Sequence, residues 1–278
     1  MRISHRTADG VESHPHEIPS FGLGVFLMSE PGECKSACLA ALAAGYTHID
    51  TARAYGNEDE VGEALKEAGV NRDDVFITTK LRRVHAVGFD EVLEHCQKSL
   101  QYLDTDYIDL YLVHAPPEDS DHRAPVWKGM EHCLEQGWVK AIGVSNYGAH
   151  HLEAMQEYAT YLPSVNQIEI NPWLQRPELR AATEGVGAKV MAYSPLARGH
   201  KLKEPELIDV ATRLGCTPAQ VAIKFCYDLG CITIPKSSRA DRIVENLASL
   251  DIDLSGEMEA IEAMECGYIS GWDPTSDP

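Results

Sequence analysis

The sequence has 278 residues, of which 24 are Lys or Arg and 43 are Asp or Glu, so its formal net charge is −19. Nucleic acids and anionic membranes attract basic surfaces, so this charge argues against either as a partner. No apolar run approaches the roughly 20 residues that cross a bilayer, and the N-terminus lacks the apolar core of a signal peptide. We therefore expect a cytoplasmic protein.

Strand-like and helix-like segments alternate along the chain, with no low-complexity linker between them. Such alternation predicts a parallel sheet, and chains somewhat above about 250 residues are common for one α/β barrel. The predicted fold is a (β/α)8 TIM barrel that forms a single domain over residues 1–278. The predicted barrel strands lie near residues 21–25, 46–50, 75–80, 107–113, 139–144, 164–168, 188–193 and 231–235.

Segments outside the barrel pattern occur at both ends of the chain. Residues 1–20 are expected to form an N-terminal β-hairpin that closes the barrel's bottom, with Asp9-Gly10 as its turn. Extra C-terminal helices are predicted near residues 239–250 and 256–266, and the tail over residues 267–278 is expected to be irregular.

Two helices carry clear signals at their ends. Asn57 is a candidate cap for a helix that ends at Gly69, and Thr217 with Pro218 indicates the start of another that ends near Gly230.

Four residues in the first half of the chain form a candidate catalytic set: Asp50, Tyr55, Lys80 and His114. Each lies in or just past a strand-like run, and such positions converge at one mouth of a (β/α)8 barrel. Taken singly, each has a structural alternative, such as a capping carboxylate or a core histidine. Together they suit proton transfer coupled to an external hydride, because none is a nucleophile paired with its own base.

The chemistry of these side chains is complementary. A phenol with a pKa near 10 is a poor proton donor at neutral pH, and an adjacent ammonium lowers that pKa. Lys80 is therefore expected to lower the pKa of Tyr55, Asp50 to keep Lys80 charged, and His114 to orient a substrate carbonyl. This chemistry requires a cofactor that supplies the hydride.

Three motifs in order resemble the aldo-keto reductase superfamily: DTARAYGNE at 50–58, IGVSN at 142–146 and IPKS at 234–237. The resemblance covers nearly the whole chain and implies NADPH-dependent reduction of aldehydes or ketones, with Tyr55 as the general acid. It also explains why no Gly-x-Gly-x-x-Gly run follows the first predicted strand, since this family does not bind its cofactor in Rossmann fashion.

The resemblance also implies where NADPH or NADP+ would bind. Ser145, Asn146 and Gln167 would bond the nicotinamide carboxamide, and Tyr193 would stack on its ring. Ser194, Leu196 and the loop around them would follow the pyrophosphate, where Arg198 would add charge. The residues implied for the 2′-phosphate and the adenine are Lys236, Ser237, Ser238, Arg242, Glu245 and Asn246.

The sequence departs from the family pattern at the expected substrate site. Phe26 and Ala115 stand where many members have tryptophan, so we expect them to line a wider pocket. A long C-terminal lid is lacking, although Trp272 could fold inward. No basic residue indicates a clamp for a carboxylate, so the predicted substrate is an aldehyde or ketone held by apolar contacts.

Several alternatives remain open at this stage. The same residues would serve a dehydrogenase that oxidises a polyol or another alcohol, and some proteins of this fold are cofactor-binding regulatory subunits. His14-Pro15-His16 has ligand-like spacing, but without nearby acidic or cysteine ligands it favours a loop, and we predict no metal site. The eight cysteines are expected to be reduced, and the protein is expected to be a monomer with a small carbonyl compound as its substrate.

Overall fold

The structure, a computed structural model, describes residues 1–7, 10–81 and 88–278 of the chain. All eight predicted barrel strands are confirmed, and they form one parallel sheet in the order β10-β9-β8-β7-β6-β5-β4-β3. The strands are β3 (Leu23–Gly24), β4 (His48–Asp50), β5 (Phe76–Leu81), β6 (Ile108–Val113), β7 (Val139–Ser145), β8 (Val165–Glu169), β9 (Lys189–Tyr193) and β10 (Ile232–Thr233).

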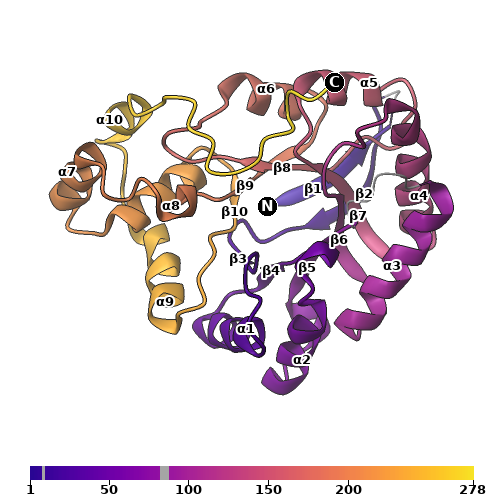
Figure 1. Cartoon of the computed structure of the whole chain (residues 1–278), viewed down its shortest axis with the longest axis horizontal. Helices are drawn as coiled ribbons and strands as arrows, with labels where there is room; N and C mark the ends of the chain where they lie inside the picture. Colours follow the sequence, from indigo (N-terminus) through magenta and orange to yellow (C-terminus); the bar gives the residue numbers. More distant parts are fainter. Residues whose placement is uncertain (8–9, 82–87) are drawn as a thin grey trace.

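Contacts between the first and last strands close the sheet into a barrel. Parallel bridges join Phe21 to Thr233 and Gly24 to Lys236. A Cβ atom at Gly24 would lie 3.0 Å from the carbonyl oxygen of Ile234, so the missing side chain lets the two segments approach closely. The predicted TIM barrel is therefore confirmed, and Figure 1 shows its strands inside a ring of helices.

Helices follow most of the strands and cover the outside of the barrel. Their bounds are α1 (Glu33–Ala44), α2 (Glu58–Ala68), α3 (Phe89–Leu103), α4 (Arg123–Glu135), α5 (Ala149–Met155), α6 (Pro177–Gly185), α7 (Pro205–Leu214), α8 (Pro218–Asp228), α9 (Ala240–Ala248) and α10 (Met258–Glu262). Short 3-10 turns are η1 (Arg53–Tyr55), η2 (Arg72–Asp74), η3 (Ser120–His122), η4 (Ala197–Gly199) and η5 (Ser249–Asp251). The two C-terminal helices predicted from the sequence are α9 and α10, and α10 lies with α7 beyond α8 in Figure 1.

The helix ends show one prediction confirmed and one corrected. Thr217 caps α8, since its side chain accepts a hydrogen bond from the Gln220 amide in a capping box. Asn57 stands at the N-cap position of α2 but forms no capping bond. Its Nδ2 donates to the carbonyls of Val25 and Met28 instead, so Asn57 holds the loop after β3 rather than the helix.

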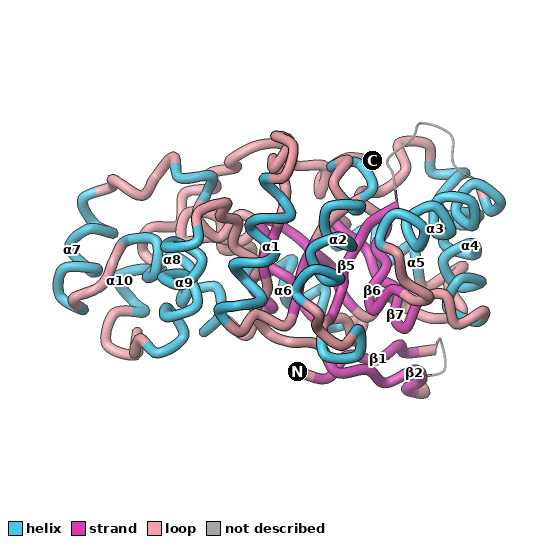
Figure 2. Tube along the Cα trace, turned by 90° about the horizontal axis from the view of Figure 1, so that it is seen from below, coloured by secondary structure: helices cyan, strands magenta, loops and turns pink. Residues whose placement is uncertain are grey.

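The N-terminal hairpin pairs β1 (Arg2–Arg6) with β2 (Glu12–Glu17), as predicted. Asp9 of the predicted turn lies outside the described residues. Ile3 and Ile18 are buried and pack against apolar side chains of the barrel interior, so the hairpin closes one end of the barrel. Figure 2 shows it beneath the strands. His14 and His16 lie within β2, so the expectation that they occupy a loop was wrong.

The core has an inner and an outer part. Side chains such as Leu112, Val165 and Met191 fill the barrel interior, and larger clusters lie between the strands and the surrounding helices. Within the described part of the chain, no helix is both long and apolar enough to cross a membrane.

Candidate active site

The carboxyl ends of the strands surround a cavity of about 560 Å³. Asp50 ends β4, Tyr55 ends η1, Lys80 lies near the end of β5, and His114 directly follows β6. Asp50, Tyr55 and His114 line the cavity, while Lys80 lies fully buried behind them. The structure thus brings the four predicted catalytic residues together, because parallel barrel strands all end at the same mouth.

Lys80 connects this group through hydrogen bonds. Its Nζ donates to Asp50 Oδ1 at 2.6 Å, to the Thr51 carbonyl at 2.8 Å and to Tyr55 Oη at 3.4 Å. An ammonium has three N–H groups, so these acceptors satisfy the buried charge completely. The other oxygen of Asp50 accepts a hydrogen bond from Gln167 Nε2 at 2.6 Å, which fixes the carboxylate from its far side.

The electrostatics of Tyr55 correct one prediction. Burial, followed by the charge of Asp50, raises the pKa of the Tyr55 hydroxyl well above its usual value, rather than lowering it. Burial also lowers the pKa of Lys80, against the opposing effect of Asp50. Tyr55 is therefore protonated at neutral pH, and the hydrogen bond from Lys80 to its oxygen, which stabilises the phenolate, acts against the effect of burial.

His114 and Phe26 flank the Tyr55 ring inside the cavity. The His114 ring centroid is 5.6 Å from that of Tyr55, with the rings at 72° to each other. The Phe26 ring centroid is 4.9 Å away on another side. The hydroxyl of Tyr55 consequently faces a space bordered by an imidazole and an apolar ring, which suits a polar carbonyl with an apolar substituent.

Asn146 organises the next part of the cavity. Its Nδ2 donates to the His114 carbonyl at 3.0 Å and to Ser145 Oγ at 3.1 Å, and its Oδ1 accepts from Tyr193 Oη at 2.8 Å. Asn146 has a φ of 62°, in the left-handed region that few residues other than glycine adopt. This network was not predicted, since nothing in the sequence marks Tyr193 as a partner of Asn146.

The loop after β9 has an unusual backbone. Ser194, Ala197 and Arg198 all have positive φ values, of 48°, 45° and 54°, although none is glycine. Such conformations cost of order 1 kcal/mol or more each and tend to occur at ligand sites. The loop places Ser194, Leu196 and Arg198 on the cavity wall, and the pyrophosphate contacts expected of all three stay a prediction.

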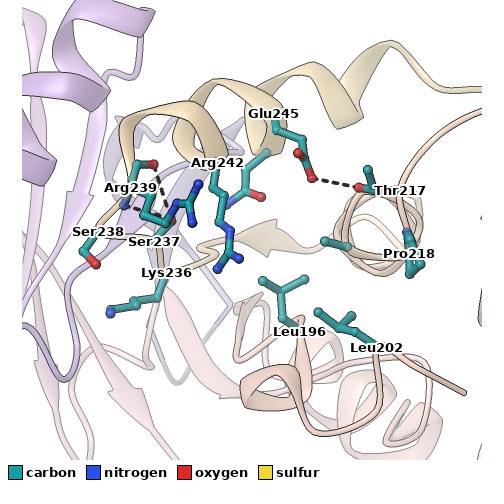
Figure 3. A pocket seen from close by; sticks show the side chains of 12 residues that line it. Leu196, Leu202, Thr217, Pro218, Lys236, Ser237, Ser238, Arg239, Arg242 and Glu245 are labelled. Atoms are coloured by element: carbon teal, nitrogen blue, oxygen red, sulfur yellow. Dashed lines mark hydrogen bonds between the residues drawn. The ribbon is translucent and has the colours of Figure 1, made fainter.

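A second cavity of about 460 Å³ adjoins the first and contains the predicted 2′-phosphate and adenine residues (Figure 3). Its lining includes Lys236, Ser237, Ser238, Arg242, Glu245 and Asn246. Leu196, Leu202, Lys236 and Arg242 line both cavities, so the two lie side by side.

Contacts at this second cavity involve residues that were not predicted. Thr217 and Pro218, from the start of α8, also line it, and Thr217 Oγ1 donates to Glu245 at 2.8 Å. A threonine that caps a helix gives no sequence signal for this second role. Arg239 also lines this cavity, and its exposed side chain pairs with Asp241 at 2.6 Å.

Comparison with known proteins agrees with this geometry. The profile of the aldo/keto reductase family matches residues 28–265. The chain is 41% identical to an aldo-keto reductase of Mycolicibacterium smegmatis, over 93% of this chain and 94% of the relative. It is 40% identical to glyoxal reductase of Bacillus subtilis, over 89% of each.

The chain belongs to the aldo-keto reductase family. Among solved structures, an aldo-keto reductase from a Medee basin deep-sea metagenome library superimposes with a TM-score of 0.87 and 37% identity, covering 91% of this chain and 93% of that one. The protein is accordingly an oxidoreductase that reduces carbonyl groups with a nicotinamide cofactor.

The two residues expected at the substrate site lie differently relative to the cavity of this aldo-keto reductase. Ala115 is buried, with 6% of its surface exposed, and it is not among the described residues that line the cavity. Phe26 does line it, as predicted. Trp173, which comes shortly after the end of β8, is buried in the core, whereas Trp272 lines the cavity.

The C-terminal tail crosses the mouth of this aldo-keto reductase. Figure 1 shows it passing from α10 over the end of the barrel toward α5. Arg176 fixes it through an ion pair with Asp273 at 2.8 Å and a hydrogen bond to Thr275 at 2.8 Å. The tail brings Trp272 to the cavity.

Proposed function

We propose that this enzyme reduces aldehydes or ketones to alcohols, with NADPH as its preferred cofactor and Tyr55 as the general acid. The observation that carries the proposal is the position of the Lys80 ammonium, which bonds both Asp50 and the Tyr55 hydroxyl at the base of the cavity. Burial makes the Tyr55 phenol a weak acid, and the Lys80 ammonium opposes this by stabilising the phenolate that proton transfer leaves behind.

A nicotinamide cofactor, when bound, would supply the hydride that the carbonyl carbon accepts. Tyr55 donates its proton to the carbonyl oxygen, and its phenolate is stabilised by the ammonium of Lys80. Asp50 keeps Lys80 charged within the buried site. His114 holds the carbonyl oxygen near the Tyr55 hydroxyl, so that the proton has a short path.

The charges that line the two adjoining cavities suit a polyanion. Lys236 and Arg242 line both of them in a protein whose net charge is −19. The acidic side chains on the described lining are already engaged, Asp50 with Lys80 and Glu245 with Thr217.

The proposed contacts divide along the cofactor. The proposed contacts to its nicotinamide half are Ser145, Asn146, Gln167 and Tyr193. In the structure Gln167 Nε2 is bonded to Asp50, so its amide oxygen is the atom that would accept from a carboxamide. Ser194 and Leu196 would border the pyrophosphate, and Lys236, Ser237, Ser238 and Arg242 would surround the 2′-phosphate, with Glu245 and Asn246 at the adenine.

The proposal is tested by single-turnover oxidation of NADPH with a panel of aldehydes and ketones. Glyoxal belongs in the panel, since one relative is named glyoxal reductase. Turnover of a carbonyl faster than oxidation of the matching alcohol with NADP+ supports the proposal. Faster alcohol oxidation would favour a dehydrogenase, and no turnover in either direction would favour a cofactor-binding regulatory subunit.

A further inference from the structure

Arg198 is a cation at the catalytic end of the cavity that the reaction described above does not use. It lies in η4 and lines the same cavity as Tyr55 and His114. Its Cζ atom is 5.6 Å from the centroid of the Phe26 ring, which itself is 4.9 Å from the ring of Tyr55. The Phe26 ring is therefore close both to the guanidinium of Arg198 and to the ring of the proton donor, Tyr55.

The backbone on both sides holds Arg198 in this place. Its own φ of 54° is a conformation that L-residues rarely adopt. A Cβ atom at Gly271 would lie 2.3 Å from Arg198 Nη2, so the C-terminal tail passes directly against the guanidinium. Trp272, the next residue of the tail, lines the same cavity. The arginine head thus sits between Phe26 and the tail.

The charge of Arg198 is not neutralised by a neighbouring carboxylate. Over residues 1–7, 10–81 and 88–278, no Asp or Glu oxygen lies within the 4.0 Å that defines an ion pair with it. Burial raises the pKa of Glu169, and the charge of Arg198 is among the smaller effects that oppose this rise. The Glu169 carboxylate instead accepts hydrogen bonds from the Ser270 amide and from Asn171.

We propose that Arg198 binds a carboxylate on the substrate, so that the preferred substrates are aldehydes or ketones that carry one. This inference rests on the proposed function and names its substrate class. A guanidinium suits this task because its planar N–H groups can bond both oxygens of a carboxylate. It revises the expectation that the substrate is held by apolar contacts alone.

The pyrophosphate of the cofactor offers the same anionic oxygens. The geometry favours the substrate, because Arg198 lies against Phe26 beside Tyr55, whereas Lys236 and Arg242 extend into the second cavity. The two sources make different kinetic predictions, since a pyrophosphate contact would affect every substrate equally.

The test compares p-carboxybenzaldehyde with its methyl ester, two substrates of nearly equal shape that differ in charge. The wild-type enzyme should have the higher kcat/KM for the acid. Arg198→Met should lower that value about tenfold, as expected for a solvent-accessible charge-assisted contact, while the ester and the KM for NADPH stay within about twofold. Arg198→Lys should retain part of the preference. Arg213→Met, which removes an arginine of α7 that pairs with Glu257, serves as the control.

Three results would overturn this assignment. Equal kcat/KM values of the wild-type enzyme for the acid and the ester would show that the enzyme does not recognise a carboxylate on the substrate. A rise in the KM for NADPH with an equal loss for both aldehydes would place Arg198 at the pyrophosphate. If the wild-type enzyme reduces neither aldehyde nor any other carbonyl, the proposed function itself fails, and the substrate class fails with it.

Discussion

The two ends of the barrel use their polar residues in opposite ways. At the floor, the hairpin covers the strands, and the buried polar groups bond one another. Asp109 shows this best: burial alone would raise its pKa, but hydrogen bonds from His16, Arg72 and the Ile77 amide hold the pKa below its ordinary value. The floor therefore contributes stability.

At the mouth, polar groups instead face a cavity. Lys236 and Arg242 present their charges along its lining, and Arg198 has no carboxylate partner among the described residues. The comparison teaches that this fold separates stabilising residues from reacting ones by the end of the strand on which they lie. The Lys80–Asp50 pair is the exception, because it is buried and also contacts the proton donor.

Lys80→Met should have the largest effect, since it damages both stability and chemistry. It leaves the Asp50 carboxylate buried without its partner, which typically costs about 3–5 kcal/mol of unfolding free energy. We also expect kcat to fall at least ~10²-fold, because the phenolate loses its stabilising charge. Urea unfolding and steady-state kinetics measure the two effects.

The matched control for this variant is Lys98→Met, which removes an exposed lysine paired with Glu94 on α3. It should change unfolding by no more than about 1 kcal/mol. An unchanged free energy of unfolding in Lys80→Met would show that the Lys80–Asp50 pair does not stabilise the fold.

Acid should destabilise the floor through His5. Burial lowers the pKa of His5 to about 4 from its usual 6.5. The neutral ring accepts from the Ile142 amide at 3.2 Å and donates to the Leu162 carbonyl at 2.9 Å, so a second ring proton would break the first bond. Between pH 6.5 and 4 the unfolded chain binds a proton that the folded one does not, so stability falls as pH falls.

The loss attributable to His5 should reach about 3 kcal/mol over that range. Urea titrations at several pH values, on the wild type and on His5→Gln, measure it. The variant should show a shallower decline with acid than the wild type. The same slope in both proteins would show that His5 is not the titrating group.

Lys236→Ala should have the smallest effect and should affect selectivity rather than rate. The Lys236 side chain is 39% exposed, and its nearest carboxylate among the described residues is that of Glu33, at 4.0 Å. Its contact with a 2′-phosphate is therefore expected to contribute about tenfold in KM. The KM for NADPH should rise while that for NADH and both kcat values change little. Equal increases in the KM values for the two cofactors would show that Lys236 does not contact the 2′-phosphate.

The sequence predicted most of the barrel, because its signals are local. Strand runs, capping residues and three motifs placed every strand and brought the four catalytic residues to one mouth. The contacts it could not predict join distant segments. Arg176 and Asp273 lie nearly a hundred positions apart, and the bond between Tyr193 and Asn146 depends on the packing of β7 beside β9 through β8.

The wrong predictions have physical causes. Asn57 has the right position to cap a helix, but its side chain donates hydrogen bonds to two carbonyls of the loop after β3 instead. The pKa of Tyr55 depends on burial, which the neighbouring charges in a sequence do not reveal.

The most direct test of the account is the single-turnover rate of NADPH oxidation in Tyr55→Phe, measured at saturating aldehyde alongside a fluorescence titration of NADPH. We predict a rate lower by about 10²–10⁴-fold with nearly unchanged cofactor affinity, because only the proton donor is lost. Tyr102→Phe, which alters an exposed tyrosine on α3, should retain the wild-type rate. A wild-type rate in Tyr55→Phe would contradict the assignment of Tyr55 as the general acid.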